Sequence, residues 1–184
     1  MIKAVIALGV PSDFHKNGIF AFGKDNDLPW GKIPEDFKLF REKTMGSVCV
    51  MGAKTFQSLP KNLPGRVMVV IGDSSRECFN QSGELPDIIM RSDINWLEVI
   101  DIVYPNKDIC LIGGLNFVMT NIDKCDEVHI NFLMLTADHD TINPSIYIND
   151  VELSEFLKNF KFDSGQRIET SVDFCNSIKI GIWK

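Results

Sequence analysis

Short runs of apolar residues recur along the chain, and segments with a helical spacing of apolar positions lie between several of them. Residues 2–8 are nearly all apolar, as in a strand that is buried on both faces of a sheet. Runs of the same kind occupy residues 48–51, 67–71, 109–112 and 128–135. All of them are far too short to cross a bilayer. The pattern therefore predicts a set of buried strands.

Two of the intervening segments are predicted to be helices. Pro34 suits the first position of a helix, and Phe37, Phe40 and the methyl group of Thr44 then share one face. Ser92 can cap a second helix. Its apolar positions follow at helical spacing: Trp96, Leu97, Ile100 and Tyr104. Strands that alternate with helices predict right-handed crossovers and a largely parallel sheet.

The last third of the chain has a different pattern. Apolar and polar or small residues alternate there, as in a half-exposed strand: Ile178, Ile180 and Ile182 against Ser177, Lys179 and Gly181. Residues 168–174 are its expected antiparallel partner, and the polar residues 11–17 are expected to form a loop. The 184 residues are predicted to form one α/β domain, residues 1–184. Its mostly parallel central sheet would have helices on both faces and a C-terminal antiparallel hairpin.

Charge and cysteine content exclude several classes of protein. The net charge of −6 and the pI near 5.0 argue against binding to nucleic acid or to anionic membranes. An anionic ligand would then need a local basic site. The five irregularly spaced cysteines and three scattered histidines predict neither a disulfide framework nor a metal site. The N-terminus lacks the features of a signal peptide, so the expected compartment is a reducing cytoplasm.

Three predicted strands end in glycine and run into a helix-like segment. The glycines are Gly52, the pair Gly113 and Gly114, and Gly72, which Asp73 follows. Glycine lets a ligand approach the backbone, and ligands of open α/β sheets bind beyond the carboxyl ends of the strands. Helix N-termini there could hold the pyrophosphate of a dinucleotide. The alternative is that each glycine only ends a strand. Neither a GxGxxG motif after the first strand nor a Walker loop is present.

A carboxylate in the first helical turn is a candidate acid. Asp36 could simply interact with the helix dipole, and Glu35 could do so equally well. Asp36 differs because Phe37, Leu39 and Phe40 make part of its surroundings apolar. Desolvation would raise its pKa, and the carboxyl group could pair with an amidine-like heterocycle through two hydrogen bonds.

An arginine follows a predicted turn at residues 63–66. Pro64 and Gly65 indicate the turn, after which Arg66 leads into a strand. Arg66 is either a solvated side chain at a loop tip or a group that binds a carboxylate in bidentate fashion.

Taken together and in this order, five segments resemble the dihydrofolate reductase family, over residues 1 to about 143. They are Leu28-Pro29-Trp30, Pro34-Glu35-Asp36-Phe37 with Phe40, residues 51–58 (MGAKTFQS), Leu63-Pro64-Gly65-Arg66, and Ile112-Gly113-Gly114. Residues 51–58 look closest to phage-type members. The resemblance implies that NADPH passes a hydride to dihydrofolate. The product, tetrahydrofolate, would serve one-carbon metabolism and thymidylate synthesis, which makes the protein an expected antifolate target.

The resemblance also implies roles for three residues near the reacting ring. Asp36 would bind the pterin amino group and ring nitrogen and promote protonation at N5. Trp30 would help to hold an ordered water through its indole N–H. Leu28 would lie in the mobile loop that closes over the nicotinamide and excludes water.

Further site residues follow from the same resemblance. The walls around the pterin and benzoyl groups would be Val5, Ile6, Phe37, Phe40, Ser58, Leu59 and Ile112. Arg66 would bind the glutamate α-carboxylate, with Arg41 and Lys61 as candidate helpers, and Asn131 takes the place of the threonine that supports the catalytic carboxylate. The cofactor groove would comprise Ala7, Gly23, Gly52, Ala53, Lys54, Thr55, Ile71, Gly72, Ser74, Gly113, Gly114, Leu115, Asn116 and Phe117. The resemblance further implies a cis peptide between Gly113 and Gly114.

Some positions depart from the family pattern. Ala53, Asp73 and Asn116 stand where the family often has arginine, serine and arginine for the 2′-phosphate of NADPH. NADPH remains the expected cofactor, with Lys54, Ser74, Ser75 or Arg76 as substitutes, and its preference over NADH is left open. Val118, next to Phe117, stands where the family usually has a tyrosine beside the nicotinamide. The loop at residues 11–18 is longer than in compact bacterial members of the family.

Two alternatives are compatible with much of this pattern. A pyrimidine reductase of riboflavin synthesis would share the fold and NADPH, but it would not need Asp36 beside Trp30, or Arg66 for a glutamate tail. A folate-binding or structural protein could keep the fold without turnover. Dihydrofolate is the expected partner, and the chain is expected to be a monomer or a homodimer.

Overall fold

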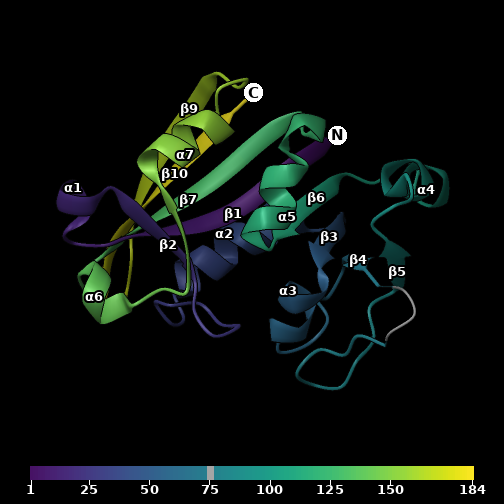
Figure 1. Ribbon diagram of the computed structural model, residues 1–184, viewed down its shortest axis with the longest axis horizontal. Helices are drawn as coiled ribbons and strands as arrows, with labels where there is room; N and C mark the ends of the chain where they lie inside the picture. Colours follow the sequence, from purple (N-terminus) through teal and green to yellow (C-terminus); the bar gives the residue numbers. More distant parts are fainter. Residues whose placement is uncertain (74–76) are drawn as a thin grey trace. The chain divides into compact units, whose positions relative to one another are not determined.

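The computed structural model describes residues 1–73 and 77–184, which fall into two compact units (Figure 1). Unit 1 comprises Met1–Ala4 and Lys43–Asp126, and unit 2 comprises Val5–Glu42 and Glu127–Lys184. Strand β1 (Ile2–Val10) begins in unit 1 and continues in unit 2.

Unit 1 is built on a parallel sheet. Its strands, in spatial order, are β5 (Ile88–Arg91), β4 (Val67–Gly72), β3 (Val48–Gly52), β6 (Ile109–Gly113) and the first residues of β1. Val50 pairs with Val69 on one side and with Leu111 on the other, and all three are fully buried. The apolar runs in these segments therefore form strands that are buried on both faces, as predicted.

Helices α3 (Ala53–Ser58) and α5 (Leu115–Thr120) begin directly after strands β3 and β6. A 3-10 turn, η1 (Ile122–Lys124), follows α5. Helix α4 (Trp96–Val103) begins after Asn95 rather than after Ser92, so the predicted cap is wrong. The guanidinium of Arg91 binds the carboxylate of Asp93 at 2.6 Å, and this pairing accompanies a turn at residues 92–93 instead of a helix.

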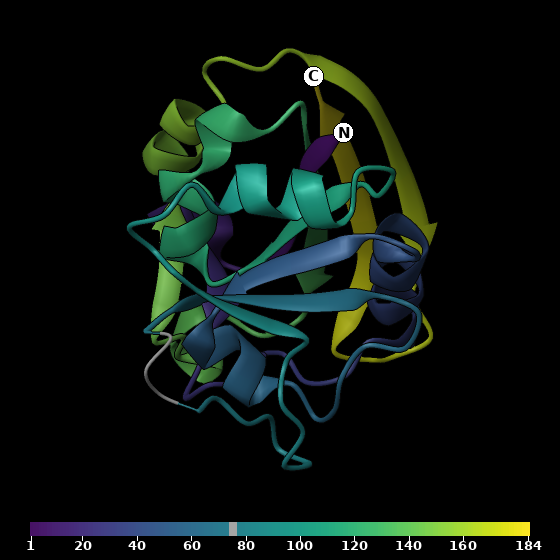
Figure 2. The same ribbon diagram turned by 90° about the vertical axis from the view of Figure 1, so that its right-hand side faces the viewer.

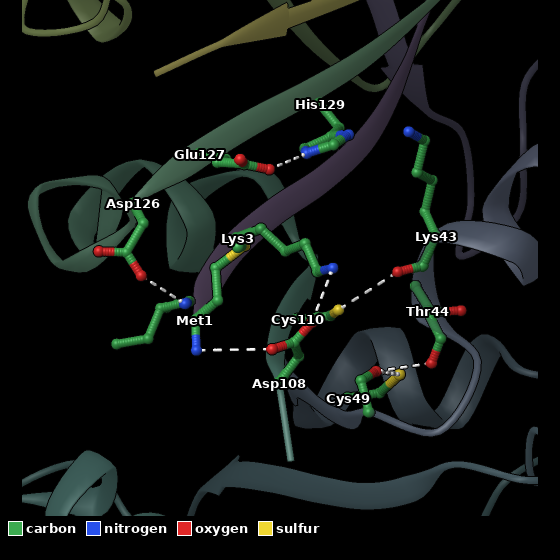
Figure 3. Close-up of polar contacts among 12 residues, drawn as sticks. Met1, Lys3, Lys43, Thr44, Cys49, Asp108, Cys110, Asp126, Glu127 and His129 are labelled. Carbon is green, nitrogen blue, oxygen red and sulfur yellow. Dashed lines mark hydrogen bonds and ion pairs between the residues drawn. The ribbon is translucent and has the colours of Figure 1, made fainter. Parts of the chain in front are cut away.

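Ionic contacts fix the start of β1 within unit 1 (Figure 3). The amino group of Met1 and the ammonium of Lys3 lie 3.5 and 3.1 Å from the carboxylate of Asp108, which precedes β6. The backbone N–H of Ile2 donates to Asp126 across 2.7 Å. These contacts set the register in which Lys3 pairs with Cys110.

Unit 2 contains the rest of β1 and mainly antiparallel pairs. Beside β1 lie, in order, β7 (Glu127–Leu135), β10 (Cys175–Trp183) and β9 (Phe162–Glu169). Strand β2 (Ile19–Gly23) pairs with β1 and with β8 (Ile146–Asn149). Figure 2 shows β9 and β10 as the long C-terminal hairpin. The sequence predicted this hairpin and the strand at residues 128–135.

The predicted partner strand of the hairpin was placed too late in the chain. β9 covers residues 162–169, and residues 170–174 form the connection to β10. The predicted alternation is also broken, because a bulge between Cys175 and Ser177 leaves both Ser177 and Ile178 buried. Of the three residues expected on the exposed face, only Lys179 is exposed.

The helices of unit 2 confirm one prediction and correct another. α2 (Pro34–Thr44) starts at the predicted proline, and its last two residues belong to unit 1. The segment expected to be a loop contains a short helix, α1 (Phe14–Asn17), which ends at the left-handed Gly18. Two further helices were not predicted: α6 (His139–Ile142) and α7 (Asp150–Phe156). α7 has a capping box between Asn149 and Glu152, a spacing that could have been found in the sequence.

The core of unit 2 gathers apolar side chains from its strands and from the segment before α2. Its buried members are Ala21, Trp30, Ile33, Leu133, Leu135, Ile142, Cys175, Ile178 and Ile180.

The architecture agrees with the predicted α/β class, a mostly parallel sheet with a C-terminal antiparallel pair, while the single domain stays a prediction. All five cysteines are free thiols. Within residues 1–73 and 77–184, no helix is both long and apolar enough to span a membrane, and no three potential ligands are grouped to hold a metal.

Candidate active site

Asp36 lies in the first turn of α2 and is only 6% exposed. The side-chain amide of Asn131, on β7, donates a hydrogen bond to its Oδ1 across 2.8 Å. Burial raises the pKa of Asp36, and the hydrogen bond from Asn131 lowers it in part. The net pKa is raised, as expected from the apolar neighbours in the sequence.

The neighbouring acid, Glu35, has a different environment. Its Oε1 accepts a hydrogen bond from the backbone N–H of Ser171 across 2.9 Å, in the connection between β9 and β10. Hydrogen bonds with Ser171 hold the pKa of Glu35 below its usual range. The structure thus separates the two adjacent carboxyl groups: Glu35 anchors a loop as an anion, whereas Asp36 is buried with a raised pKa.

Trp30 is 7% exposed, and its ring packs closely on the backbone of β1. A Cβ atom at Gly9 would lie only 2.7 Å from Cε3 of Trp30, so no larger residue fits there without displacing the ring. The indole N–H is buried and has no hydrogen-bond acceptor among the described residues. Leu28, two residues earlier, is partly buried against the core of unit 2.

The other predicted site residues of unit 2 lie on β1, β2 and α2 and differ in burial. Val5 and Ile6 are buried in β1, and Ala7 is partly buried against the core. On α2, Phe40 is half-buried and Phe37 is 42% exposed. Gly23 ends β2, where its carbonyl accepts from the backbone N–H of Ser145 at 2.9 Å.

In unit 1, two glycine-terminated strands lie next to each other and lead into helices. Gly52 precedes α3 and Gly114 precedes α5, and no side chain caps either helix. The peptide bond between Gly113 and Gly114 is cis, as the family resemblance implied. A Cβ atom at Gly113 would lie 3.0 Å from the methyl group of Thr55, while one at Gly52 would meet nothing within 4 Å. The first N–H groups of both helices thus lie at the carboxyl edge of the sheet.

The third strand end differs from the prediction. Ile71 is buried and Gly72 ends β4, but the described residues that follow, 73 and 77–87, contain no helix. Residues 80–85 instead form hydrogen bonds with the loop after α3. Ser74, Ser75 and Arg76 lie outside the described residues.

Further predicted cofactor residues lie on or beside α3 and α5. Lys54 and Asn116 are exposed, Ala53 is half-buried and Leu115 is buried. Phe117 packs on Trp96 with ring centroids 6.0 Å apart, and Val118, at the position of the usual tyrosine, is fully buried.

Residues 63–66 form the predicted turn in front of β4. Gly65 has a φ of +75°, and the N–H of Arg66 bonds the carbonyl of Leu63 at 3.3 Å, as in a type II turn. The half-buried guanidinium donates from Nη1 to Thr44 at 3.1 Å and from Nε to the carbonyl of Pro64 at 3.2 Å. Arg66 is therefore held against unit 1 rather than extended into solvent.

The remaining predicted residues lie on several elements of the two units. Ser58 and Leu59 are half-buried at the end of α3, Ile112 is half-buried in β6, and Arg41 and Lys61 are exposed. Lys61 is near Glu84, whose pKa it helps to lower. Asn80 and Glu84, which bond to this loop, were missed by the sequence analysis because polar residues in a turn-rich segment give no periodic signal.

Comparison with known proteins agrees with this geometry. A family model described as dihydrofolate reductase matches residues 14–176. The chain is 57% identical over 119 residues to dihydrofolate reductase type 9 of Escherichia coli, covering 65% of this chain and 67% of the relative. It is 31% identical over 147 residues to the dihydrofolate reductase of Haemophilus influenzae, covering 80% and 85% of the two chains. The chain belongs to the dihydrofolate reductase family.

A solved structure shows the same fold. Dihydrofolate reductase from Enterococcus faecalis, complexed with NADP(H) and RAB-propyl, is similar with a TM-score of 0.65 and 22% sequence identity. The match covers 100% of this chain and 96% of that structure. As a member of the dihydrofolate reductase family, the chain is an NADPH-dependent oxidoreductase, as its motifs implied, rather than a pyrimidine reductase. The phage-type assignment stays a prediction.

Proposed function

We propose that this dihydrofolate reductase uses Asp36 to bind and protonate the pterin ring. A carboxyl group can hold the amino group and the adjacent ring nitrogen through two hydrogen bonds. The observation that carries the proposal is that Asp36 is buried and accepts a hydrogen bond from Asn131. The bond fixes the carboxyl group, and burial leaves its pKa raised. With a raised pKa, the carboxyl group of Asp36 can better promote protonation at N5 of the pterin near neutral pH.

Trp30 would act beside Asp36 as a fixed donor. Its buried indole N–H lacks an acceptor among the described residues, and such a group has a strong requirement for one. A water molecule or a substrate atom would meet that requirement. Leu28, in the same segment, is proposed to close over the nicotinamide and keep bulk water from the reacting atoms.

Arg66 is proposed to bind the α-carboxylate of the substrate's glutamate tail. In a protein of net charge −6, an anionic substrate needs such a local cation. The bonds to Thr44 and to the carbonyl of Pro64 orient the guanidinium. Bidentate pairing with a carboxylate requires that orientation, which a flexible lysine would not give. The residues proposed to contact the pterin and benzoyl groups are Val5, Ile6, Phe37, Phe40, Ser58, Leu59 and Ile112.

The residues at the two glycine-terminated strands fit a dinucleotide. The space beside Gly52 and the uncapped N-termini of α3 and α5 suit a pyrophosphate, which accepts hydrogen bonds from backbone N–H groups. NADPH, when bound, supplies the hydride that dihydrofolate accepts. Residues 52–55 and 113–117, with Ala7, Gly23, Ile71, Gly72 and Ser74, are proposed to hold it. Lys54, which is exposed on α3, is the proposed cation for the 2′-phosphate.

The assignment to the cytoplasm is also a proposal, supported by five free thiols that a reducing compartment would preserve. The oligomeric state is proposed to be a monomer or a homodimer.

The test is the loss of NADPH absorbance when the purified protein is mixed with dihydrofolate. Parallel reactions contain methotrexate, or NADH in place of NADPH. Methotrexate-sensitive oxidation supports the proposal, and the NADH reaction shows whether Ala53 has relaxed the choice of cofactor. A folded protein that binds folate and NADPH stoichiometrically without oxidation would instead be a binding protein.

A further inference from the structure

Two loops of unit 1 are joined by hydrogen bonds, and we call residues 80–85 the clasp. The backbone N–H and the side-chain amide of Gln81 donate to the carbonyls of Leu59 and Ser58 at 3.0 and 3.1 Å. The hydroxyl of Ser82 donates to the carbonyl of Pro60. Three successive carbonyls at the end of α3 are thus bound by the clasp.

Asn80 is the centre of the clasp and is only 5% exposed. Its Oδ1 accepts from the backbone N–H groups of Ser82 and Glu84, both at 3.0 Å. Its Nδ2 donates to Asn62 at 3.1 Å and to the carboxylate of Glu84 at 2.9 Å. Both N–H donors and two acceptor sites of the amide are therefore used, and the side chain has one orientation that satisfies them.

Glu84 closes the clasp from the other side. Its Oε2 accepts from the backbone N–H of Asn62 at 2.5 Å, and the side-chain amide of Asn62 donates to the carbonyl of Leu85 at 2.9 Å. The hydrogen bonds with Asn62 and Asn80, together with nearby Lys61, lower the pKa of Glu84. The clasp is thus held by an ionised carboxylate at neutral pH.

The loop that the clasp holds has no regular secondary structure. α3 ends at Ser58 and β4 begins at Val67, so residues 59–66 belong to neither a helix nor a strand. Ser58 and Leu59 are proposed walls for the benzoyl group, and Arg66 is the proposed cation for the glutamate carboxylate. The bonded residues 58–62 therefore contain two of the proposed wall residues and precede the turn that carries Arg66.

We propose that Asn80 and Glu84 are positioning residues for the benzoylglutamate part of dihydrofolate. The inference rests on the proposed function. The clasp fixes residues 58–62 and, through them, the start of the turn that carries Arg66. It does not act on the pterin ring, because Asp36, Asn131 and Trp30 lie in unit 2 and are held by contacts of their own.

The experiment compares two substrates in three variants. Glu84→Ala removes the acceptor, Glu84→Gln keeps a side-chain oxygen for both bonds, and Glu98→Ala is the matched control. The side-chain amide of Asn95 donates to Glu98 at 3.0 Å on the exposed surface at the start of α4, so removal of Glu98 breaks a similar bond outside the clasp. The substrates are dihydrofolate and 6-methyl-7,8-dihydropterin, which lacks the benzoylglutamate tail. Circular dichroism checks that each variant folds.

In Glu84→Ala the KM for dihydrofolate should rise about threefold to tenfold, the effect of losing hydrogen bonds to a charged group in a partly exposed site. Its kcat, its KM for NADPH and its kcat/KM for the tail-less dihydropterin should stay within about twofold of wild type, and Glu84→Gln should restore most of the loss. An unchanged KM for dihydrofolate in folded Glu84→Ala would overturn the proposal. Equal losses with both substrates would also overturn it, since the clasp would then support the whole site.

Failure of the proposed function has a different signature. Wild-type protein without methotrexate-sensitive turnover would contradict the function, and calorimetric binding of folate to wild type, Glu84→Ala and Glu98→Ala would then test the clasp directly. Weaker binding in Glu84→Ala alone supports the clasp, and equal affinity in all three proteins, or no folate binding by wild type, overturns it.

Discussion

The side-chain amide of Asn131 donates a hydrogen bond to the carboxylate of Asp36 across 2.8 Å, and so connects strand β7 to the first turn of helix α2. Burial and this bond act on Asp36 in opposite directions. Burial disfavours the charged carboxylate and raises the pKa, whereas the bond favours the charged form and lowers it. The residue pair therefore sets the pH at which the proposed acid is protonated.

Asn131→Ala should move the pH profile of kcat/KM for dihydrofolate to higher pH. Removing a donor to the charged form leaves desolvation unopposed, so the pKa of Asp36 rises further. Asn131→Thr is the matched control, because a hydroxyl group can still donate. Steady-state rates from pH 5 to 9 check this, and a profile for Asn131→Ala that coincides with wild type would contradict it.

Asp36→Asn should lower kcat at pH 7 by about a hundredfold or more, the usual contribution of a positioned acid. The remaining activity should depend less on pH, because the protonatable group is gone. Turnover is measured between pH 5 and 8. Equal rates for the variant and wild type across that range would remove Asp36 from the mechanism.

The same substitution should make the fold more stable at neutral pH. Asp36 has a raised pKa in the folded protein and an ordinary value of 3.8 when unfolded, so the folded state binds more protons between these two pKa values. Wild-type stability then falls as pH rises through that interval. The Tm difference between Asp36→Asn and wild type should grow from pH 4 to pH 7. A difference that stayed constant would show that burial of Asp36 is not linked to its ionisation.

Arg66→Leu should raise the KM for dihydrofolate by about tenfold to a hundredfold, since a charge-assisted bidentate pair is lost. The KM for NADPH should change little. Arg66→Lys, which keeps the charge without the fork of donors, should be intermediate. Steady-state kinetics with each substrate varied in turn measure both constants, and equal increases in the two KM values would place Arg66 outside the tail site.

Two glycine substitutions should separate cofactor binding from stability. At Gly52 an added Cβ meets nothing within 4 Å, so Gly52→Ala should keep its Tm and raise the KM for NADPH by about tenfold, because the methyl group occupies space proposed for the cofactor. At Gly113 a Cβ would lie 3.0 Å from Thr55, and the φ of +149° disfavours a side chain. Gly113→Ala should therefore also lose about 1–3 kcal/mol of stability. Thermal unfolding and KM measurements distinguish the two, and a normal KM for NADPH in Gly52→Ala would contradict the proposed groove.

The sequence by itself determined the elements whose signal is local. Apolar runs located the strands at residues 48–51, 67–71 and 109–112, because a strand buried on both faces has a continuous apolar sequence. Pro34 located the start of α2. Proline suits the first position of a helix because the backbone N–H that it lacks would have no partner within the helix there. The ordered motifs around Trp30, Asp36, Arg66 and Gly113 carried the family assignment.

Only the tertiary structure decided which groups pair across long separations in the chain. It assigned Glu35 to the backbone of Ser171 and Asp36 to the amide of Asn131, although the two acids are adjacent in the sequence. It replaced the expected partner of β10 with residues 162–169, because residues 170–174 form the connection between the two strands. It also bonded the clasp to the loop after α3. Such pairs depend on where folding brings distant backbone and polar groups together, and a polar side chain in a loop leaves no periodic trace in the sequence.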